Sequence, residues 1–188
     1  MNWPYFYNCC MHIILLFLII VSCESKESIR TYRLSKKPNK VSVQDIKDNK
    51  DKFALEYTIP VSWEKFSGHA MRLASFYAHY NGGKGEVSVT EFSGISGGIE
   101  ANINRWRKQI SLPPESLDNI LKSCSELKGE LSDFRYFELV NDSTKQAILA
   151  SIFQLKNRTV FVKLSIDQSG INSVNEDFLS FSKSISEK

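Results

Sequence analysis

Beyond an apolar N-terminus, hydrophobic and polar residues first alternate with a period of about two. This period is typical of β-strands, whose successive side chains point to opposite faces of a sheet. Residues 53–60, 71–80 and 86–92 each predict a strand. Asn81-Gly82-Gly83 favours a tight turn between the last two. The sequence therefore predicts an antiparallel hairpin over residues 71–92.

The apolar residues then change to a helical spacing. Ile99, Ile103, Trp106 and Ile110 form one stripe, which predicts a helix packed on the sheet with Trp106 in the core. Leu112-Pro113-Pro114 ends this helix. A second helix is expected from near Pro114 onward. Its apolar side consists of Leu117, Ile120, Leu121, Cys124 and Leu127, and Cys124 is therefore expected to be a buried thiol.

The last third of the chain returns to strands before a final helix. Residues 134–140, 146–155 and 159–166 predict three strands, of which the last two form a hairpin. The closing helix has Ser173 and Glu176 at capping-box spacing near its start. Its apolar stripe is Val174, Phe178, Phe181 and Ile185. Strands, two helices, strands and a helix predict an α+β domain over residues 53–188, with helices on an antiparallel sheet.

The apolar N-terminus ends in a motif with a chemical meaning. Its unbroken apolar run, residues 13–21, is too short to span a bilayer but fits a signal peptide. Ile20-Val21-Ser22-Cys23 matches the lipobox of bacterial lipoproteins. We expect residues 1–22 to be removed, from a start at Met1 or Met11, and Cys23 to carry acyl chains. The alternative is a simple membrane anchor that ends in an incidental cysteine.

The charges are distributed unevenly. Residues 24–52 hold nine Lys or Arg and five Asp or Glu, a net charge of +4, whereas residues 53–188 have a net charge of −1. We interpret residues 23–52 as a solvated tether rather than a headgroup-binding segment. The near-neutral domain argues against a nucleic-acid partner. Once Cys23 is acylated, Cys124 is the only thiol left, and neither a disulfide nor a zinc site or other cofactor is expected.

A glycine-rich segment that leads into the first helix is the main candidate for binding. Such a segment offers free N–H groups to an anion, and Asn102, Arg105 and Gln109 share a helix face distinct from the apolar stripe. One hypothesis is that this face binds a small anion or a partner's backbone. The other is that the polar groups tie the helix to neighbouring loops. The candidate binding residues are Arg72, Gly97, Gly98, Asn102, Asn104, Arg105, Arg107 and Gln109.

An enzyme is not expected. After removal of the signal peptide only His69 and His79 remain as histidines, and the chain has no Gly-x-Ser-x-Gly elbow. A hydrolase would need a serine, one of these histidines and an acid to converge in a pocket.

Several motifs in residues 57–114 resemble a family of uncharacterised bacterial lipoproteins. They are Pro60-Val61-Ser62-Trp63, Met71-Arg72 followed by Ser75-Phe76, and Gly97-Gly98 with Ala101-Asn102, Asn104-Arg105-Trp106-Arg107 and Gln109. Lys108 stands where the family often has glycine. More distantly, the layout resembles the fold of PsbP, DcrB and the Ran-binding Mog proteins. That resemblance implies an α/β/α sandwich that serves as a binding or assembly module, and it supplies no catalytic residues.

Together these patterns predict a monomeric, lipid-anchored domain on the periplasmic or outer side of the bacterial cell envelope. The expected role is a non-catalytic binding or assembly module for an envelope protein complex. A lipoprotein that binds a small anionic ligand is the alternative, and a hydrolase is the third possibility.

Overall fold

The structure, a computed structural model, describes residues 55–188, and its centre is a seven-stranded antiparallel sheet. The predicted signal peptide, Cys23 and the predicted tether lie outside the described residues. The order across the sheet is β2-β3-β4-β8-β7-β6-β5. The first half of the chain therefore meets the second half where β4 pairs with β8. The strands are β2 (Trp63–Lys65), β3 (Arg72–Tyr80), β4 (Gly83–Ser93), β5 (Ser125–Leu127), β6 (Phe134–Asn141), β7 (Gln146–Gln154) and β8 (Arg158–Asp167).

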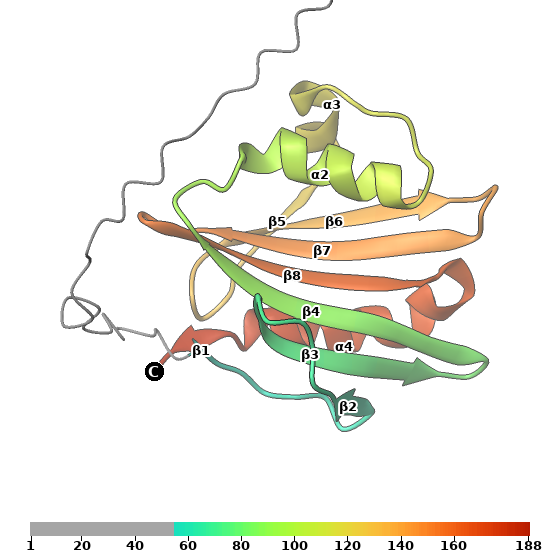
Figure 1. The fold of residues 1–188 in the computed structure, drawn as a ribbon, viewed down its shortest axis with the longest axis horizontal. Coiled ribbons are helices and arrows are strands. Elements are labelled where there is room, and N and C mark those ends of the chain that lie inside the picture. The colour runs from blue at the N-terminus through green and yellow to red at the C-terminus, as the bar shows by residue number, and fades with distance from the viewer. Residues whose placement is uncertain (1–54) are drawn as a thin grey trace, which may run out of the picture. The chain divides into compact units, whose positions relative to one another are not determined.

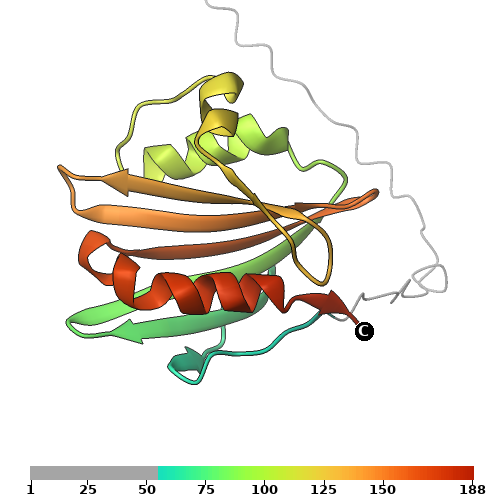
Figure 2. The ribbon, with the colours of Figure 1, turned by 180° about the vertical axis from the view of Figure 1, so that it is seen from behind.

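Helices lie on both sides of this sheet (Figures 1 and 2). On one side are α2 (Gly98–Gln109) and α3 (Leu117–Lys122). On the other is α4 (Ile171–Lys183), which follows the short 3-10 helix η1 (Gln168–Gly170). The predicted α+β class and the arrangement of helices on both faces of an antiparallel sheet are therefore confirmed.

Each side of the sheet has its own hydrophobic core. Under α4, all four residues of the predicted stripe are buried with the inward side chains of β3, β4, β8 and β7, including Val87, Val89 and Leu164. Under α2, Ile103, Trp106 and Ile110 pack with apolar residues of β6, β7 and β8. The rings of Trp106 and Phe161 meet edge to face with centroids 5.7 Å apart, which confirms Trp106 as a core residue.

The predicted hairpin and the last three strands are also confirmed, because their patterns are long and regular. Tyr80 pairs with Gly83 across a turn in which Gly82 has φ = 105°, a value that favours glycine. In β8, the alternate residues Val160, Val162, Leu164 and Ile166 all lie in the core under α4.

Two predicted elements differ from the structure. Of residues 55–60, the described part of the strand predicted over residues 53–60, only Leu55–Glu56 form a strand, β1, which pairs with the C-terminal β9 (Ser186–Glu187) outside the main sheet. The second helix was expected to continue to Leu127, but α3 ends at Lys122 and the chain turns into the edge strand β5. The backbone of β5 gains hydrogen bonds with β6, which outweigh a weak helical pattern.

The early end of α3 changes the environment of its expected apolar side. Ile120 is buried at 1% exposure, whereas Leu117 and Leu121 are 40% and 38% exposed. Cys124 follows the helix, is only half-buried, and lies near the carbonyl oxygen of Leu121 at 3.2 Å. Cys124 was expected to be a buried core thiol; it packs against the core under α2 but is only partly buried. The capping box was also misplaced, since α4 begins at Ile171 and Ser173 lies within its first turn.

Candidate functional site

The helices α2 and α3 cover only part of their side of the sheet (Figure 1), where α2 packs on β6, β7 and the Phe161 end of β8. There the strands present apolar side chains, among them Phe137, Leu139 and Ile148. On β3, β4 and the adjoining part of β8, the same face is polar. It consists of Arg72, Ser75, Tyr77, Glu86, Ser88 and Lys163, and we call it the open sheet face.

The strand register places these side chains on one face. Val87 and Val89 of β4 point into the core under α4, so Glu86 and Ser88 between them point the opposite way. Ser88 pairs with Ser75 on β3 and with Lys163 on β8. Ser88 and Lys163, which are 75 positions apart in the sequence, thus become cross-strand neighbours.

Arg72 and Glu86 form the main ion pair of this face. Arg72 Nη1 lies 2.5 Å from Glu86 Oε1 and 3.4 Å from Ser75 Oγ. The side chain of Arg72 is 19% exposed and that of Glu86 is 44% exposed. The guanidinium is therefore held in a half-buried position over the sheet, with one edge of the carboxylate accessible to solvent.

Lys163 is a second half-buried cation on this face. Its Nζ donates a hydrogen bond of 3.0 Å to Gln109 Oε1 on α2. Burial lowers the pKa of Lys163, and the positive charges of Arg72 and Arg105 lower this pKa further, while the charge of Glu86 opposes them. Lys163 therefore lies close to two other cations and has only one carboxylate among these neighbours.

The helix α2 borders the open sheet face through Arg105 and Gln109, which share a helix face because they lie four residues apart. Both side chains are exposed. Arg105 donates to the side-chain oxygen of Asn102, and Gln109 accepts from Lys163. The structure thus brings three of the predicted residues, Arg72, Arg105 and Gln109, to one polar surface.

The other predicted residues are bonded within α2 and its adjoining loops. Asn102 is buried at 2% exposure and donates to the carbonyl oxygens of Ser96 and Gly98. Gly97 (φ = 81°) and Gly98 (φ = 77°) form the turn that Asn102 closes.

Asn104 and Arg107 bind the loop that follows α2. Asn104 donates to the carbonyl oxygen of Glu115 and accepts from its N–H, each at 2.8 Å. Arg107 is 8% exposed, with Nε 2.7 Å from the carbonyl oxygen of Pro113 and Nη2 2.8 Å from Glu115 Oε1. These contacts match the hypothesis that polar groups tie the helix to neighbouring loops.

Sequence reasoning missed Glu86 and Lys163. Both alternate with buried apolar residues, as exposed strand positions do, so neither stood out. The signal that identifies them is pairing: Lys163 meets Ser88 across β4 and β8, and Glu86 meets Tyr77 across β3 and β4. The pairing of Glu86 with Tyr77 lies within the predicted hairpin, whereas the pairing of Lys163 with Ser88 follows from no local pattern.

Tyr77 of the open sheet face has two contacts of its own, and a hollow lies nearby at the end of α2. Phe66 stacks on Tyr77 with ring centroids 4.1 Å apart, and Lys84 Nζ lies 3.5 Å from the centroid of the Tyr77 ring. A hollow of about 280 Å³ opens beside Lys84 and Gln109 where α2 ends. It is also lined by Ile110, Gln146, Ala147, Ile148, Ser165, Ile166 and Asp167.

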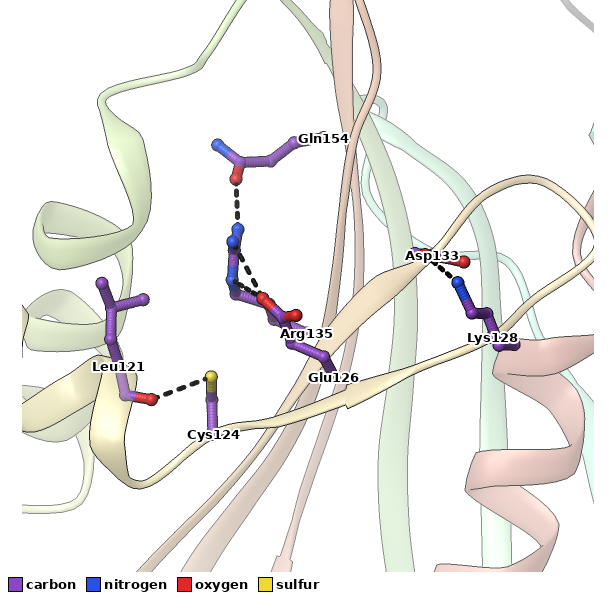
Figure 3. A network of polar contacts seen from close by, with 7 residues as sticks. All are labelled: Leu121, Cys124, Glu126, Lys128, Asp133, Arg135 and Gln154. Atoms are coloured by element: carbon purple, nitrogen blue, oxygen red, sulfur yellow. Dashed lines mark hydrogen bonds and ion pairs between the residues drawn. The ribbon is translucent and has the colours of Figure 1, made fainter.

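A second polar cluster lies on β5 and β6 (Figure 3). Arg135 contacts Glu126 Oε1 through Nε at 3.1 Å and Nη2 at 3.0 Å, and Nη1 donates to Gln154 at 2.8 Å. A hollow of about 270 Å³ adjoins it. Because Arg135 is already paired with a carboxylate, this cluster is electrically more balanced than the open sheet face.

The two histidines occupy exposed positions in the described part of the chain. His79 Nε2 lies 3.1 Å from Glu64 Oε2 at the edge of the sheet, and His69 lies in the loop before β3. Within residues 55–188, no group of three or more His, Cys, Asp or Glu side chains is placed to hold a metal ion. No helix in this range is long and apolar enough to cross a membrane.

Comparisons with known proteins show structural similarity only. No protein-family model matches the chain, and no curated protein matches it. The solution structure of cyanobacterial PsbP (CyanoP) from Synechocystis sp. PCC 6803 is similar with 15% identity and a TM-score of 0.48, over 73% of this chain and 89% of that one. The distant structural resemblance to PsbP is thus found, and no sequence family is shown.

Two further solved structures are similar at lower scores. LpqN, described as involved in cell envelope biogenesis of Mycobacterium tuberculosis, has 9% identity and a TM-score of 0.43, over 74% of this chain and 87% of LpqN. A protein from Bacteroides thetaiotaomicron VPI-5482 has 15% identity and a TM-score of 0.43, over 71% of this chain and 45% of its own.

Proposed function

We propose that this protein is a lipid-anchored, non-catalytic binding module of the bacterial cell envelope, and that the open sheet face contacts its partner. The observation that supports this role is the excess of positive charge on that face. Among the described residues, the charges that act on Lys163 are those of Arg72, Arg105 and one carboxylate, Glu86, which is paired with Arg72. An acidic surface of an envelope protein would complement them.

The physical argument concerns the cost of holding these cations. Half-buried charges lose hydration, and like charges placed together repel. A fold that needed only stability would place neutral side chains at positions 72 and 163. Groups of perturbed, unbalanced charge are enriched at functional sites, so the open sheet face is the best-supported contact surface of the described domain.

The anchor in this proposal is the acyl-modified Cys23, followed by the charged tether of residues 23–52. Two acyl chains are needed for stable attachment, since each buried CH₂ contributes only about 0.8 kcal/mol. Replacing the acylated sulfur by Cys23→Ala is expected to leave the precursor unacylated and uncleaved, as mass spectrometry of the envelope fraction would show. Normal processing of this variant would contradict the anchor.

The contact surface is tested by site-specific cross-linking in intact envelopes. A photoreactive p-benzoylphenylalanine replaces Tyr77 on the open sheet face, and a matched control places it at the exposed Asn172 of α4, on the other side of the sheet. We expect a discrete cross-linked protein from position 77 only. Lys163→Glu, which makes the charges of the face equal in number, should abolish the product. Equal cross-linking from both positions would refute the assignment.

A small anionic ligand is the second candidate, supported by the hollow beside Lys84 and Gln109. Its volume of about 280 Å³ is close to the lower end of small-molecule sites.

A further inference from the structure

We propose that the open sheet face holds a phosphate or carboxylate group of a small ligand between Arg72, Arg105 and Lys163. This inference goes beyond the proposed function, because it assigns a small ligand to that face and holds with or without a protein partner.

The first argument is the identity of the atoms that these cations contact now. Lys163 donates to the neutral Gln109, and Arg105 to the neutral Asn102. Arg72 divides Nη1 between Glu86 and the neutral Ser75. Hydrogen bonds between ions are roughly twice as strong as those between neutral groups, so an incoming oxyanion would provide better acceptors than the three neutral oxygens.

The second argument is that the cations are held in place before any ligand arrives. Arg72 lies on β3 and Lys163 on β8, the two strands that flank β4, and each of these three strands is paired on both sides. The helix that carries Arg105 is fixed by Asn104 at Glu115 and, at its end, by Asn141, which donates to the carbonyl oxygen of Ile110 at 2.7 Å. A site on rigid elements binds without paying for ordering.

The third argument is the role of Glu86. Its carboxylate lies 2.5 Å from Arg72 Nη1 and is 44% exposed, so it occupies the position that a ligand oxyanion would compete for. If the site accepts an oxyanion, removing this charge strengthens binding. A surface that attracts anions only through its overall charge would respond equally to any change of one charge.

The test uses the acylated full-length protein in micelles of an uncharged detergent, titrated calorimetrically at low ionic strength with inorganic phosphate and with acetate. We expect saturable binding of at least one ion. Glu86→Gln should tighten binding about fivefold, the equivalent of about 1 kcal/mol for one charge pair. Lys163→Met should weaken it by at least about fivefold. The matched control Lys183→Met removes one exposed positive charge on α4, and should leave binding unchanged.

Several results would overturn the inference. They are the absence of saturable binding in both the natural protein and Glu86→Gln, or equal weakening by Lys163→Met and Lys183→Met. Binding to phosphatidylglycerol vesicles with no binding of phosphate or acetate would also overturn it, because the surface would then recognise a membrane. Ion binding without a cross-link from position 77 would support this inference and contradict the proposed protein partner. A cross-link from position 77 without ion binding would contradict this inference and support the protein partner.

Discussion

Arg107 is expected to stabilise the domain, although it lies in the same polar segment of α2 as the residues at the open sheet face. We consider Arg107→Met, which removes the guanidinium but keeps most of the aliphatic stem. The variant loses two contacts, Nε to the carbonyl oxygen of Pro113 at 2.7 Å and Nη2 to Glu115 Oε1 at 2.8 Å. Both contacts connect α2 to the loop that follows it.

The magnitude follows from the burial of the two contacts. A hydrogen bond from a charged donor contributes about 1.5–3 kcal/mol when it is shielded from water, and Arg107 is 8% exposed. The ion pair adds less than about 1 kcal/mol, because the Glu115 side chain is 35% exposed and solvent screens it. We therefore expect the free energy of unfolding to fall by about 2–3 kcal/mol, which lowers Tm by about 6–12 °C for a domain of this size.

Urea denaturation followed by tryptophan fluorescence measures this loss, because Trp106 packs in the core beside Arg107. The matched control is Lys108→Met, which removes the same charge from the neighbouring, exposed position of α2 and should change stability by less than about 0.5 kcal/mol. A loss below 1 kcal/mol for Arg107→Met, or an equal loss for Lys108→Met, would refute the reasoning that Arg107 fixes the loop.

Three further predictions concern buried polar groups. Burial lowers the pKa of Lys163 in the folded state, so between this lowered pKa and the ordinary value of 10.5 the unfolded chain binds more protons than the folded one, and the free energy of unfolding should rise with pH. Lys163→Met should flatten this rise in urea titrations at a series of pH values. An unchanged slope in the variant would contradict the prediction. Ser182→Ala should lower the free energy of unfolding by about 1–3 kcal/mol, because it leaves the fully buried hydroxyl of Ser151 without its 2.9 Å partner. Replacing Ser151 by Ala as well should recover most of this loss in urea denaturation. An equal loss in the single and the double variant would contradict the role of the Ser151–Ser182 hydrogen bond. Trp63→Phe removes apolar contacts but also removes a buried Nε1 that has no partner among the described residues, so the free energy of unfolding should change by less than about 1 kcal/mol. Trp63→Ala should lower it by about 3–5 kcal/mol. Similar melting curves for the two variants would contradict this difference.

Elements with a long, regular pattern were predictable from the sequence. The predicted stripe of the closing helix has four residues that all reach the core, and in β8 every second residue from Val160 to Ile166 lies in the core under α4. In such segments every residue repeats the same local signal, and packing then agrees with propensity. The fold class follows from the order of these elements.

Short elements depend on partners far away in the sequence, and they were not predictable. Within the described part of the first predicted strand, β1 consists of Leu55 and Glu56, whose partner is β9 at the other end of the chain. Likewise, β5 takes residues from a weak helical pattern because β6 supplies a hydrogen-bonding edge. In both cases a tertiary contact outweighs local preference.

The candidate site was predictable in part, since Arg72, Arg105 and Gln109 were among the candidate residues and Glu86 and Lys163 were not. Arg105 and Gln109 share a face of α2 by simple spacing, and sequence reasoning found both. Lys163 and Glu86 join them through the registers of β3, β4 and β8, which no local pattern contains. The Arg72–Glu86 pair likewise depends on the hairpin register rather than on any motif.

The polar residues of α2 also show why a choice between a structural and a binding role for the whole segment was too coarse. Successive residues of a helix point about 100° apart, so residues in one motif reach different surroundings. Asn104 and Arg107 reach the following loop, whereas Arg105 and Gln109 reach the opposite border at Lys163. Because the loop fixes one flank of the helix and the core fixes its apolar stripe, the remaining flank can move little. A helix constrained in this way holds Arg105 in place at the open sheet face, and the same rigidity makes that face suitable for recognising a charged group.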